Sequence, residues 1–313
     1  MDDATLAALG LLGPPAALVW GSLWGSFLNV VVHRLPRGES LVRPGSRCPG
    51  CGKGIRAFDN VPVLSWLILR GKCRDCAAPI SPRYPMVEAL TAVISLALFH
   101  HHVTLGPQAA PLVALLAPYL LHFAFAAALI AITFIDLDIQ IVPNSITFPF
   151  MALGLISAAL LPDVPFLEAV VGLILGYGVI VGISAAYKAL RGADGMGGGD
   201  AKLLGMIGAW LGYRSFLFLI LAGSLQGLLM AALLGVLRRL GLNVGLYDAS
   251  NLDDDDESAA LPKAGEDQAL GQLALPFGPY LALAALEWIL VGEPISEWYI
   301  DLVAGLLGVG EGG

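Results

Sequence analysis

The sequence predicts an all-α polytopic membrane protein with about eight transmembrane helices and a small cytoplasmic insert. Of its 313 residues, 57% are hydrophobic and only 13% are charged, against roughly 25% charged for a typical soluble domain. Long apolar runs recur along the chain, and its four cysteines fall in two close pairs. An ordinary soluble enzyme is therefore excluded, and the net charge of −8 gives no basis for nucleic-acid binding.

The apolar runs set the expected spans, because a crossing helix needs about 20 mostly apolar residues. The run 203–213 is too short to cross about 30 Å at 1.5 Å per residue, so we expect a half-helix or re-entrant segment there. The apolar tail 298–310 is typical of an interfacial helix, although a ninth span stays open. The eight runs are 16–33, 85–103, 112–135, 146–161, 167–189, 203–213, 215–237 and 273–291.

The distribution of basic residues predicts the orientation. Segment 34–84 carries ten of the 17 Lys and Arg residues and only three acids, so the positive-inside rule places it in the cytoplasm. The N-terminus is then outside, and counting spans puts 136–145, 190–202 and 238–272 inside as well. Because 1–33 begins with acidic residues and has no small-residue cleavage site, we expect a retained span rather than a signal peptide.

Five regions follow from these patterns. The segment 238–272 contains a run of Asp and Glu among Ser, Ala, Gly and Pro, which is typical of a solvated linker. The run lacks the alternating ligands and the Gly turn of a calcium loop. The regions are the first span 1–33, a cytoplasmic loop 34–84, a transmembrane core 85–237, the acidic cytoplasmic linker 238–272, and a transmembrane and interfacial C-terminal segment 273–313.

The four cysteines form two C-x2-C pairs, Cys48–Cys51 and Cys73–Cys76, with 21 residues between them. This spacing indicates a zinc-ribbon-like insert with tetrahedral metal ligation. Disulfides are disfavoured because cytoplasmic thiols are kept reduced, while a redox pair and an unused loop remain alternatives. Four thiolates would fill the coordination sphere, so the zinc is expected to be structural.

Two aspartates lie at the ends of apolar segments. Asp136 continues the apolar run 112–135, and Asp200 follows a glycine-rich stretch and precedes another apolar segment. An ionised carboxylate at the membrane edge costs a few kcal/mol unless it is paired or hydrated, so such residues are functional candidates. The alternatives without a functional role are a helix-end carboxylate that faces water, for Asp136, and a flexible turn in which the aspartate caps the helix, for Asp200.

The predicted topology puts Asp136 and Asp200 on the same side of the membrane. Two carboxyl groups that share a site hold one proton between them. One can then activate water while the other polarises a peptide carbonyl, which is the chemistry of aspartyl proteolysis. We expect a supporting role for five neighbours, namely Asp138, Gly197, Gly198, Gly199 and Lys202.

Several blocks, in their order along the chain, together resemble the type IV prepilin peptidases, which are bacterial inner-membrane aspartyl proteases of the GxGD type. The resemblance covers about residues 20–291. It is carried by Gly25-Ser26-Phe27-Leu28-Asn29, His33-Arg34-Leu35-Pro36, both cysteine pairs, Arg83-Tyr84-Pro85 with Glu88, Ile135-Asp136-Leu137-Asp138, Gly197-Gly198-Gly199-Asp200-Ala201-Lys202 and Pro276-Phe277-Gly278-Pro279.

The resemblance implies cleavage of the basic leader of type IV prepilins and type II secretion pseudopilins after a glycine, with Asp136 and Asp200 as the catalytic pair. It also implies N-methylation of the new N-terminus with S-adenosylmethionine, although the sequence locates no site for this methyl donor. The expected partners are these substrates and the lipid bilayer. Because the basic loop would repel a basic leader, we assign leader recognition to an acid elsewhere, with Glu88 as the candidate.

Two other classes of function use similar features. An ion- or proton-coupled transporter also needs intramembrane carboxylates and glycine-broken helices, but it predicts an inverted repeat that the sequence lacks. An assembly protein of a secretion machine would tolerate changes at either aspartate. A zinc metalloprotease is disfavoured because no H-E-x-x-H motif is present.

Overall fold

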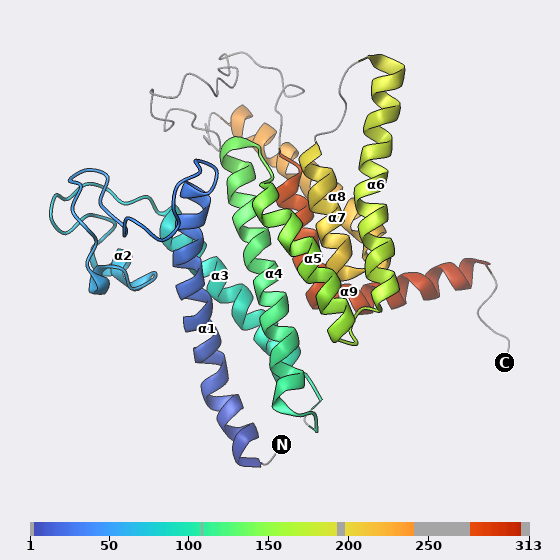
Figure 1. Cartoon of the computed structure of the whole chain (residues 1–313), viewed down its shortest axis with the longest axis horizontal. Coiled ribbons are helices and arrows are strands. Elements are labelled where there is room, and N and C mark those ends of the chain that lie inside the picture. The colour runs from blue at the N-terminus through green and yellow to red at the C-terminus, as the bar shows by residue number, and fades with distance from the viewer. Residues whose placement is uncertain (1–2, 108, 193–197, 241–275, 308–313) are drawn as a thin grey trace.

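The computed structural model describes residues 3–107, 109–192, 198–240 and 276–307, and within these ranges the protein is mostly helical, with irregular structure chiefly in the cysteine-containing insert (Figure 1). Every apolar run expected to be a helix is one. Three short elements connect them: η1 (Ala57–Asp59), the π-helical η2 (His100–Thr104) and η3 (Tyr213–Ser215). The helices are α1 (Asp3–Arg34), α2 (Leu64–Ile68), α3 (Arg83–Phe99), α4 (Leu112–Ile139), α5 (Asn144–Leu160), α6 (Phe166–Arg191), α7 (Gly198–Leu211), α8 (Phe216–Arg239) and α9 (Gly278–Leu307).

Five helices among the described residues are long and apolar enough to cross a membrane, so this is a multi-pass membrane protein. The segment Asn144–Leu160 and the first part of α9, Gly278–Gly292, are apolar but shorter. Helix α7 has 14 residues, or about 21 Å of length, which confirms that this segment is short. The five long segments are Thr5–Arg34, Arg83–Thr104, Leu112–Ile139, Phe166–Arg191 and Tyr213–Leu237.

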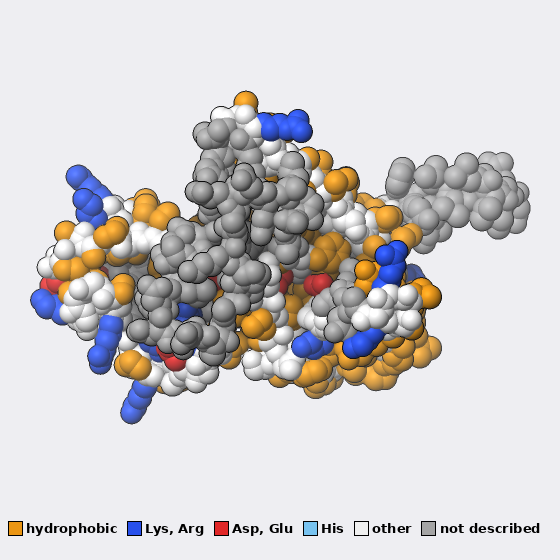
Figure 2. Space-filling view, turned by 90° about the horizontal axis from the view of Figure 1, so that it is seen from above, with side chains coloured by type: hydrophobic (Ala, Val, Ile, Leu, Met, Phe, Trp, Pro, Cys, Tyr) orange, Lys and Arg blue, Asp and Glu red, His pale blue; other side chains and the backbone are white. Residues whose placement is uncertain are grey.

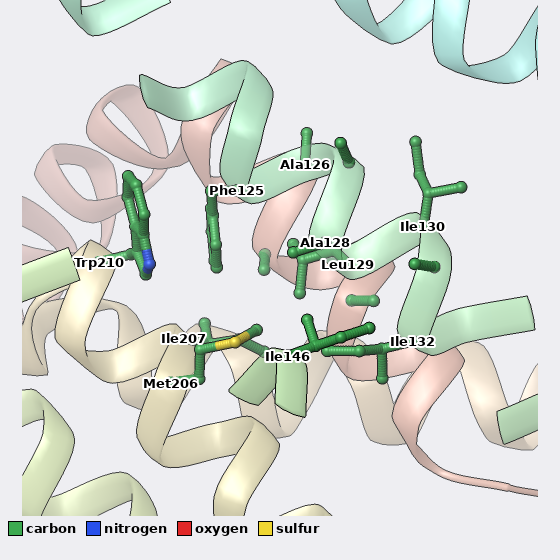
Figure 3. Close-up of a cluster of buried hydrophobic side chains, with 14 of the residues drawn as sticks. Phe125, Ala126, Ala128, Leu129, Ile130, Ile132, Ile146, Met206, Ile207 and Trp210 are labelled. Atoms are coloured by element: carbon green, nitrogen blue, oxygen red, sulfur yellow. The ribbon is translucent and has the colours of Figure 1, made fainter. Parts of the chain in front are cut away.

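The short helix α7 forms the centre of the bundle and packs against α5, α6 and α9. All of its residues from Leu203 to Leu211 are buried. Figure 3 shows Trp210 of α7 facing Phe125 of α4, and these two rings stack with centroids 4.7 Å apart. The Trp210 indole also donates a hydrogen bond to the carbonyl of Phe150 at 2.7 Å, so this end of α7 is fixed to both α4 and α5.

Helices α6 and α7 approach so closely that their backbones touch. A methyl group added at Gly172 would meet the backbone oxygen of Gly208, and one added at Gly208 would meet that of Gly172. Gly176 lies in the same way against the backbone of Leu204. Small residues permit this close contact between membrane helices. The position of α7, and of the aspartate in its first turn, is therefore set by glycines.

Two helices extend beyond the expected runs. Helix α1 begins at Asp3 and continues through Pro14 and Pro15, since a proline removes one hydrogen bond without ending the rest of the ladder. Helix α4 runs on to Ile139, so Asp136 is helical rather than part of a loop. The turn ends at Gln140, which has a φ of 55° and whose N–H donates to the carbonyl of Asp136 at 2.9 Å.

One face of the bundle gathers the connections that the sequence predicts to be inside. In Figure 1, α1, α4, α6 and α8 end at this face, and α5, α7 and α9 begin there. The cysteine-containing insert lies beside the end of α1 at the same face. Most of the acidic linker predicted at 238–272 lies outside the described residues. Beyond Pro294, α9 bends away from the bundle and continues to Leu307.

Candidate functional site

The first candidate carboxylate, Asp136, lies in the last turn of α4 and is only 5% exposed. Its Oδ2 atom is buried and has no hydrogen-bond partner among the described residues. Buried polar atoms are nearly always paired in folded proteins. A buried carboxylate at the end of a membrane helix is costly to keep, so Asp136 is a functional candidate.

The second candidate, Asp200, lies in the first turn of α7 and is partly buried. It is close enough to Asp136 for their carboxylates to interact electrostatically. Helices α4 and α7 thus bring together two acidic groups that are 64 positions apart in the sequence. Like charges that share a partly dry site cannot both ionise comfortably, which makes the two residues candidates for acid–base chemistry.

A third segment closes the site from the other side. Gly278, the first residue of α9, lies against Asp136, and a methyl group added at Gly278 would collide with Oδ2 of that carboxylate. The turn is fixed by the N–H of Tyr280, which donates to the carbonyl of Phe277 at 3.1 Å. The segment around Gly278 therefore forms a wall of the aspartate site, which requires a residue without a side chain.

The expected supporting residues do not form one cluster. Asp138 points away from the pair and binds Arg83 of α3, with Nη1–Oδ1 at 2.6 Å and Nη2–Oδ2 at 2.8 Å. Lys202 donates to the side-chain oxygen of Asn144 at 2.6 Å and so links α7 to α5. Gly199 packs against Val142, Gly198 has open space around it, and Gly197 lies outside the described residues.

The four cysteines converge on one point in the insert. Their sulfur atoms all lie within 4.8 Å of one another, and Cys48 Sγ is 3.7 Å from Cys76 Sγ. Tetrahedral zinc with Zn–S bonds of about 2.3 Å requires sulfurs about 3.8 Å apart. The residues therefore fit a four-thiolate metal ion. Among these thiols, a hydrogen bond from the backbone of Cys51 lowers the pKa of Cys48 to about 7, whereas burial and the neighbouring thiols raise the pKa of Cys76.

Each cysteine pair sits in a matching backbone turn. In the first, the N–H of Gly52 donates to the carbonyl of Cys48 at 2.8 Å, and in the second the N–H of Ala77 donates to that of Cys73 at 2.9 Å. Both turns need the left-handed backbone region, with φ of 68° at Gly52 and 57° at Ala77. The sequence analysis singles out only the cysteines, whereas the structure shows two equivalent knuckles.

The insert is fastened to the membrane helices by Glu88 of α3. Glu88 is buried, and its Oε2 accepts a hydrogen bond from the backbone N–H of Val63 at 2.7 Å. Within the insert, the Arg74 guanidinium binds Asp59 through both carboxylate oxygens, and these hydrogen bonds hold the pKa of the Asp59 carboxyl below its usual range. The structure thus gives Glu88 an anchoring contact, and leader recognition by this residue stays a prediction.

Sequence reasoning gave no role to Arg83 or Gly278, although both lie in blocks that carry the resemblance. Arg83 is the contact between α3 and the end of α4, and Gly278 is a wall of the aspartate site. In the sequence, Gly278 stands out only as a glycine between two prolines in Pro276-Phe277-Gly278-Pro279, and Arg83 only as an arginine just before a membrane helix. Neither pattern indicates which distant residue is touched.

The fold and site define a multi-pass helical membrane protein with a close aspartate pair and a four-cysteine insert. Comparisons with known proteins agree. Residues 19–102 match the bacterial peptidase A24 N-terminal domain, and residues 123–232 match the type IV leader peptidase family. The chain belongs to this peptidase family.

The curated relatives carry a common name, prepilin leader peptidase/N-methyltransferase. One from Aeromonas hydrophila is 38% identical over 88% of this chain and 90% of its own length. One from Neisseria gonorrhoeae is 38% identical over 74% of this chain and 85% of its own length. One from Myxococcus xanthus is 33% identical over 96% of this chain and 97% of its own length. No solved structure matches.

Proposed function

We propose that the protein is a membrane aspartyl endopeptidase that removes the leader of type IV prepilins and type II secretion pseudopilins after a glycine. The observation that carries the proposal is that the last turn of α4, with Asp136, and the beginning of α7, with Asp200, meet at Gly278, which lies against both Asp136 and Leu203. The names of the relatives support the same activity and add N-methylation of the product with S-adenosylmethionine. The comparisons give the transporter alternative no support.

The aspartate pair supplies acid and base. The ionised carboxylate draws a proton from water as the water attacks the scissile carbonyl, and the protonated carboxyl donates a hydrogen bond to the carbonyl oxygen. The proton later reaches the leaving amine. The Asp136 carboxylate lies against Gly278, so this position excludes a side chain that would displace the catalytic oxygen.

The substrate class fits the position of the pair. A prepilin has a basic leader followed by a hydrophobic segment, so its scissile bond lies at the membrane edge. Asp136 and Asp200 lie at the ends of membrane helices on the face that carries the insert (Figure 1). We assign this face to the cytoplasm, the N-terminus to the outside and the protein to the bacterial inner membrane.

We propose that the cysteine cluster holds one structural Zn²⁺. Figure 2 shows Lys and Arg side chains gathered over the insert at the rim of the face. Each basic residue near an anionic membrane surface contributes about 1 kcal/mol of attraction. The insert would therefore rest on lipid headgroups, while the metal keeps it folded and takes no part in the cleavage.

The test is cleavage of a purified prepilin by the detergent-solubilised protein, with the new N-terminus identified by mass. Asp136→Asn and Asp200→Asn should each abolish cleavage while leaving the protein folded. Asp163→Asn is the matched control, because Asp163 is exposed in the connection before α6, at the far end of the bundle. Cleavage that persists in either active-site variant would remove that aspartate from the pair.

A further inference from the structure

The short helix α2 of the insert reverses the pattern of a helix on a soluble surface. Its side chains Leu64, Leu67 and Ile68 are 57%, 58% and 74% exposed, whereas Ser65 is buried. A surface helix of a soluble domain turns its apolar residues to the core and its polar residues to water. Exposed apolar side chains gathered in one place indicate a surface that contacts a membrane or a partner.

The inward side of α2 is fixed by hydrogen bonds. The Ser65 hydroxyl donates to the carbonyl of Phe58 at 3.1 Å and accepts from the backbone N–H of Val61 at 2.9 Å. The Trp66 indole N–H donates to the carbonyl of Ile80 at 3.0 Å. The fold of the insert therefore sets the orientation of α2 and leaves its apolar side facing outward.

The level of α2 in the molecule favours lipid as the partner of this side. In Figure 1, α2 lies beside the bundle, below the end of α1 and level with the first part of α3. Both of these helices belong to segments that are long and apolar enough to cross a membrane. The depth that α2 reaches is therefore that of the lipid headgroups and the adjoining part of the acyl chains. Helices that lie in this interface bury their apolar side chains about 5–10 Å deep.

The charges beside α2 have the sign that an anionic membrane surface attracts. Arg70 and Lys72 follow the helix closely, and both are exposed. The acids nearest to them, Asp59 and Asp75, are each paired with an arginine. A basic rim around an apolar tip is the arrangement found in segments that lie on anionic membranes.

The N-terminal end of α2 is attached to the membrane helices. Val63, which precedes the helix, donates its backbone N–H to the Glu88 carboxylate of α3 at 2.7 Å. Val63 has a φ of 60°, which a β-branched residue adopts only where its surroundings hold it there. Because Arg83 at the start of α3 binds Asp138 of α4, the depth of α2 is coupled to the part of α4 that carries the aspartate site.

We propose that α2 is an interfacial anchor, in which Leu64, Leu67 and Ile68 enter the cytoplasmic leaflet of the membrane. Arg70 and Lys72 bind the phosphate groups of anionic lipids around it. The proposal rests on the proposed function for the side of the membrane, and it goes beyond contact of the insert with headgroups because it assigns the residues that penetrate the lipid. The anchor fixes the height of the insert above the aspartate pair.

Lipid contact can be measured without any catalysis. A fluorescent non-natural amino acid replaces Leu67 in the full chain, which is reconstituted in vesicles of phosphatidylcholine and phosphatidylglycerol, with or without bromine on the acyl chains. Bromine quenches only a fluorophore that it contacts, so the label at position 67 should lose most of its fluorescence. The same label should be quenched at Leu228, which is exposed on the membrane helix α8, and hardly at Lys53 in the first cysteine knuckle.

Protease access in the same vesicles gives a second measurement. Trypsin should spare the bonds after Arg70 and Lys72 in the wild type and cut them when Leu67→Asp and Ile68→Asp are combined. Val42→Asp is the matched control, because Val42 is an exposed apolar residue of the insert outside α2, and it should leave both bonds protected. Wild-type melting temperatures in detergent show that these variants are folded.

The outcomes separate this proposal from the peptidase proposal. A label at position 67 that brominated lipid does not quench, or equal protection of the double variant and the wild type, would overturn the lipid anchor. Quenching by a second labelled copy of the chain instead of by lipid would also overturn it, because another chain then covers α2. Wild-type protein that cleaves no prepilin but shows quenching at position 67 would overturn the peptidase proposal alone.

Discussion

Arg83 and Asp138 form a two-pronged ion pair between the beginning of α3 and the last turn of α4. Arg83 also donates to the carbonyl of Phe134 at 3.3 Å and lies over the ring of that residue, 5.1 Å from its centroid. Because the insert leads directly into α3, these contacts tie its position to the helix that carries Asp136. The pair is partly exposed and adds little stability, so its importance is positional.

Replacing Arg83 with Met should lower prepilin cleavage by about tenfold or more, because a small displacement of a catalytic group is costly. Arg83→Lys should recover only part of the activity, since lysine cannot make the two parallel hydrogen bonds. The measurement is kcat for a purified prepilin. Arg214→Met is the control, because it breaks an exposed Arg–Glu ion pair of 2.9 Å at the other end of the bundle. Equal effects of Arg83→Met and Arg214→Met would contradict a positional role.

Gly278→Ala should reduce cleavage by about a hundredfold, because the new methyl group must displace the Asp136 carboxylate or the start of α9. Gly182→Ala provides the comparison, since Gly182 lies on α6 with nothing within 4 Å of the added atom. Both variants should keep their thermal stability in detergent within a few degrees. A fully active Gly278→Ala would mean that the wall tolerates a side chain.

Alanine substitution of a glycine at the contact between α6 and α7 should destabilise the protein far more than substitution of a glycine with open space around it. Gly208→Ala forces a methyl group against the backbone of Gly172, and overpacking of this kind costs about 1–3 kcal/mol. Gly178→Ala adds the same atom on α6 in open space. Thermal unfolding in detergent should therefore drop clearly for the first variant and hardly change for the second. Equal melting temperatures would show that the two helices can separate without loss.

The helical architecture follows from the sequence because most of the apolar runs are long, and a run of about 20 apolar residues indicates a membrane helix. The end of α4 was missed since its final turn contains Asp136 and Asp138, and charged residues ended the apolar run there. Packing against other helices and the contact with Arg83 stabilise that turn. Among the described residues, α5, α7 and the first part of α9 are apolar but shorter than the five long segments.

Opposite exchanges at the left-handed positions of the two cysteine knuckles should have different effects on stability. Gly52→Ala places a side chain at a φ of 68° and should destabilise the insert by about 1 kcal/mol. Ala77→Gly removes such strain at the equivalent position and should be neutral or slightly stabilising. Thermal release of bound zinc, followed with a metal-sensitive dye, reports both effects. A destabilising Ala77→Gly of the same size as Gly52→Ala would contradict the equivalence of the turns.

Removal of any one thiol should lower the zinc content of the purified protein. Cys73→Ser is the sharpest case, because the first turn remains intact while one ligand is lost. Elemental analysis should give about one zinc per wild-type chain and much less in the variant. Unchanged zinc content in single variants of all four cysteines would remove the assignment.

Of the site, the sequence could predict the residue types but not all of their partners. The paired spacing of the four cysteines favours one metal site over a redox pair or an unused loop, and the structure brings their sulfur atoms together. Asp136 and Asp200 were found because a carboxylate at the end of an apolar run is costly. The Arg83–Asp138 and Gly278–Asp136 contacts join segments far apart in the chain, and only the helix packing decides them.

The wall formed by Gly278 has a consequence for how activity is acquired. Both aspartates lie within residues 123–232, yet one wall of their site belongs to a helix that begins at residue 278. During synthesis, a chain that has reached only α8 carries both acids but an open site. We therefore expect peptidase activity only after α9 has packed against the aspartates. An incompletely synthesised chain would then not cleave neighbouring membrane proteins.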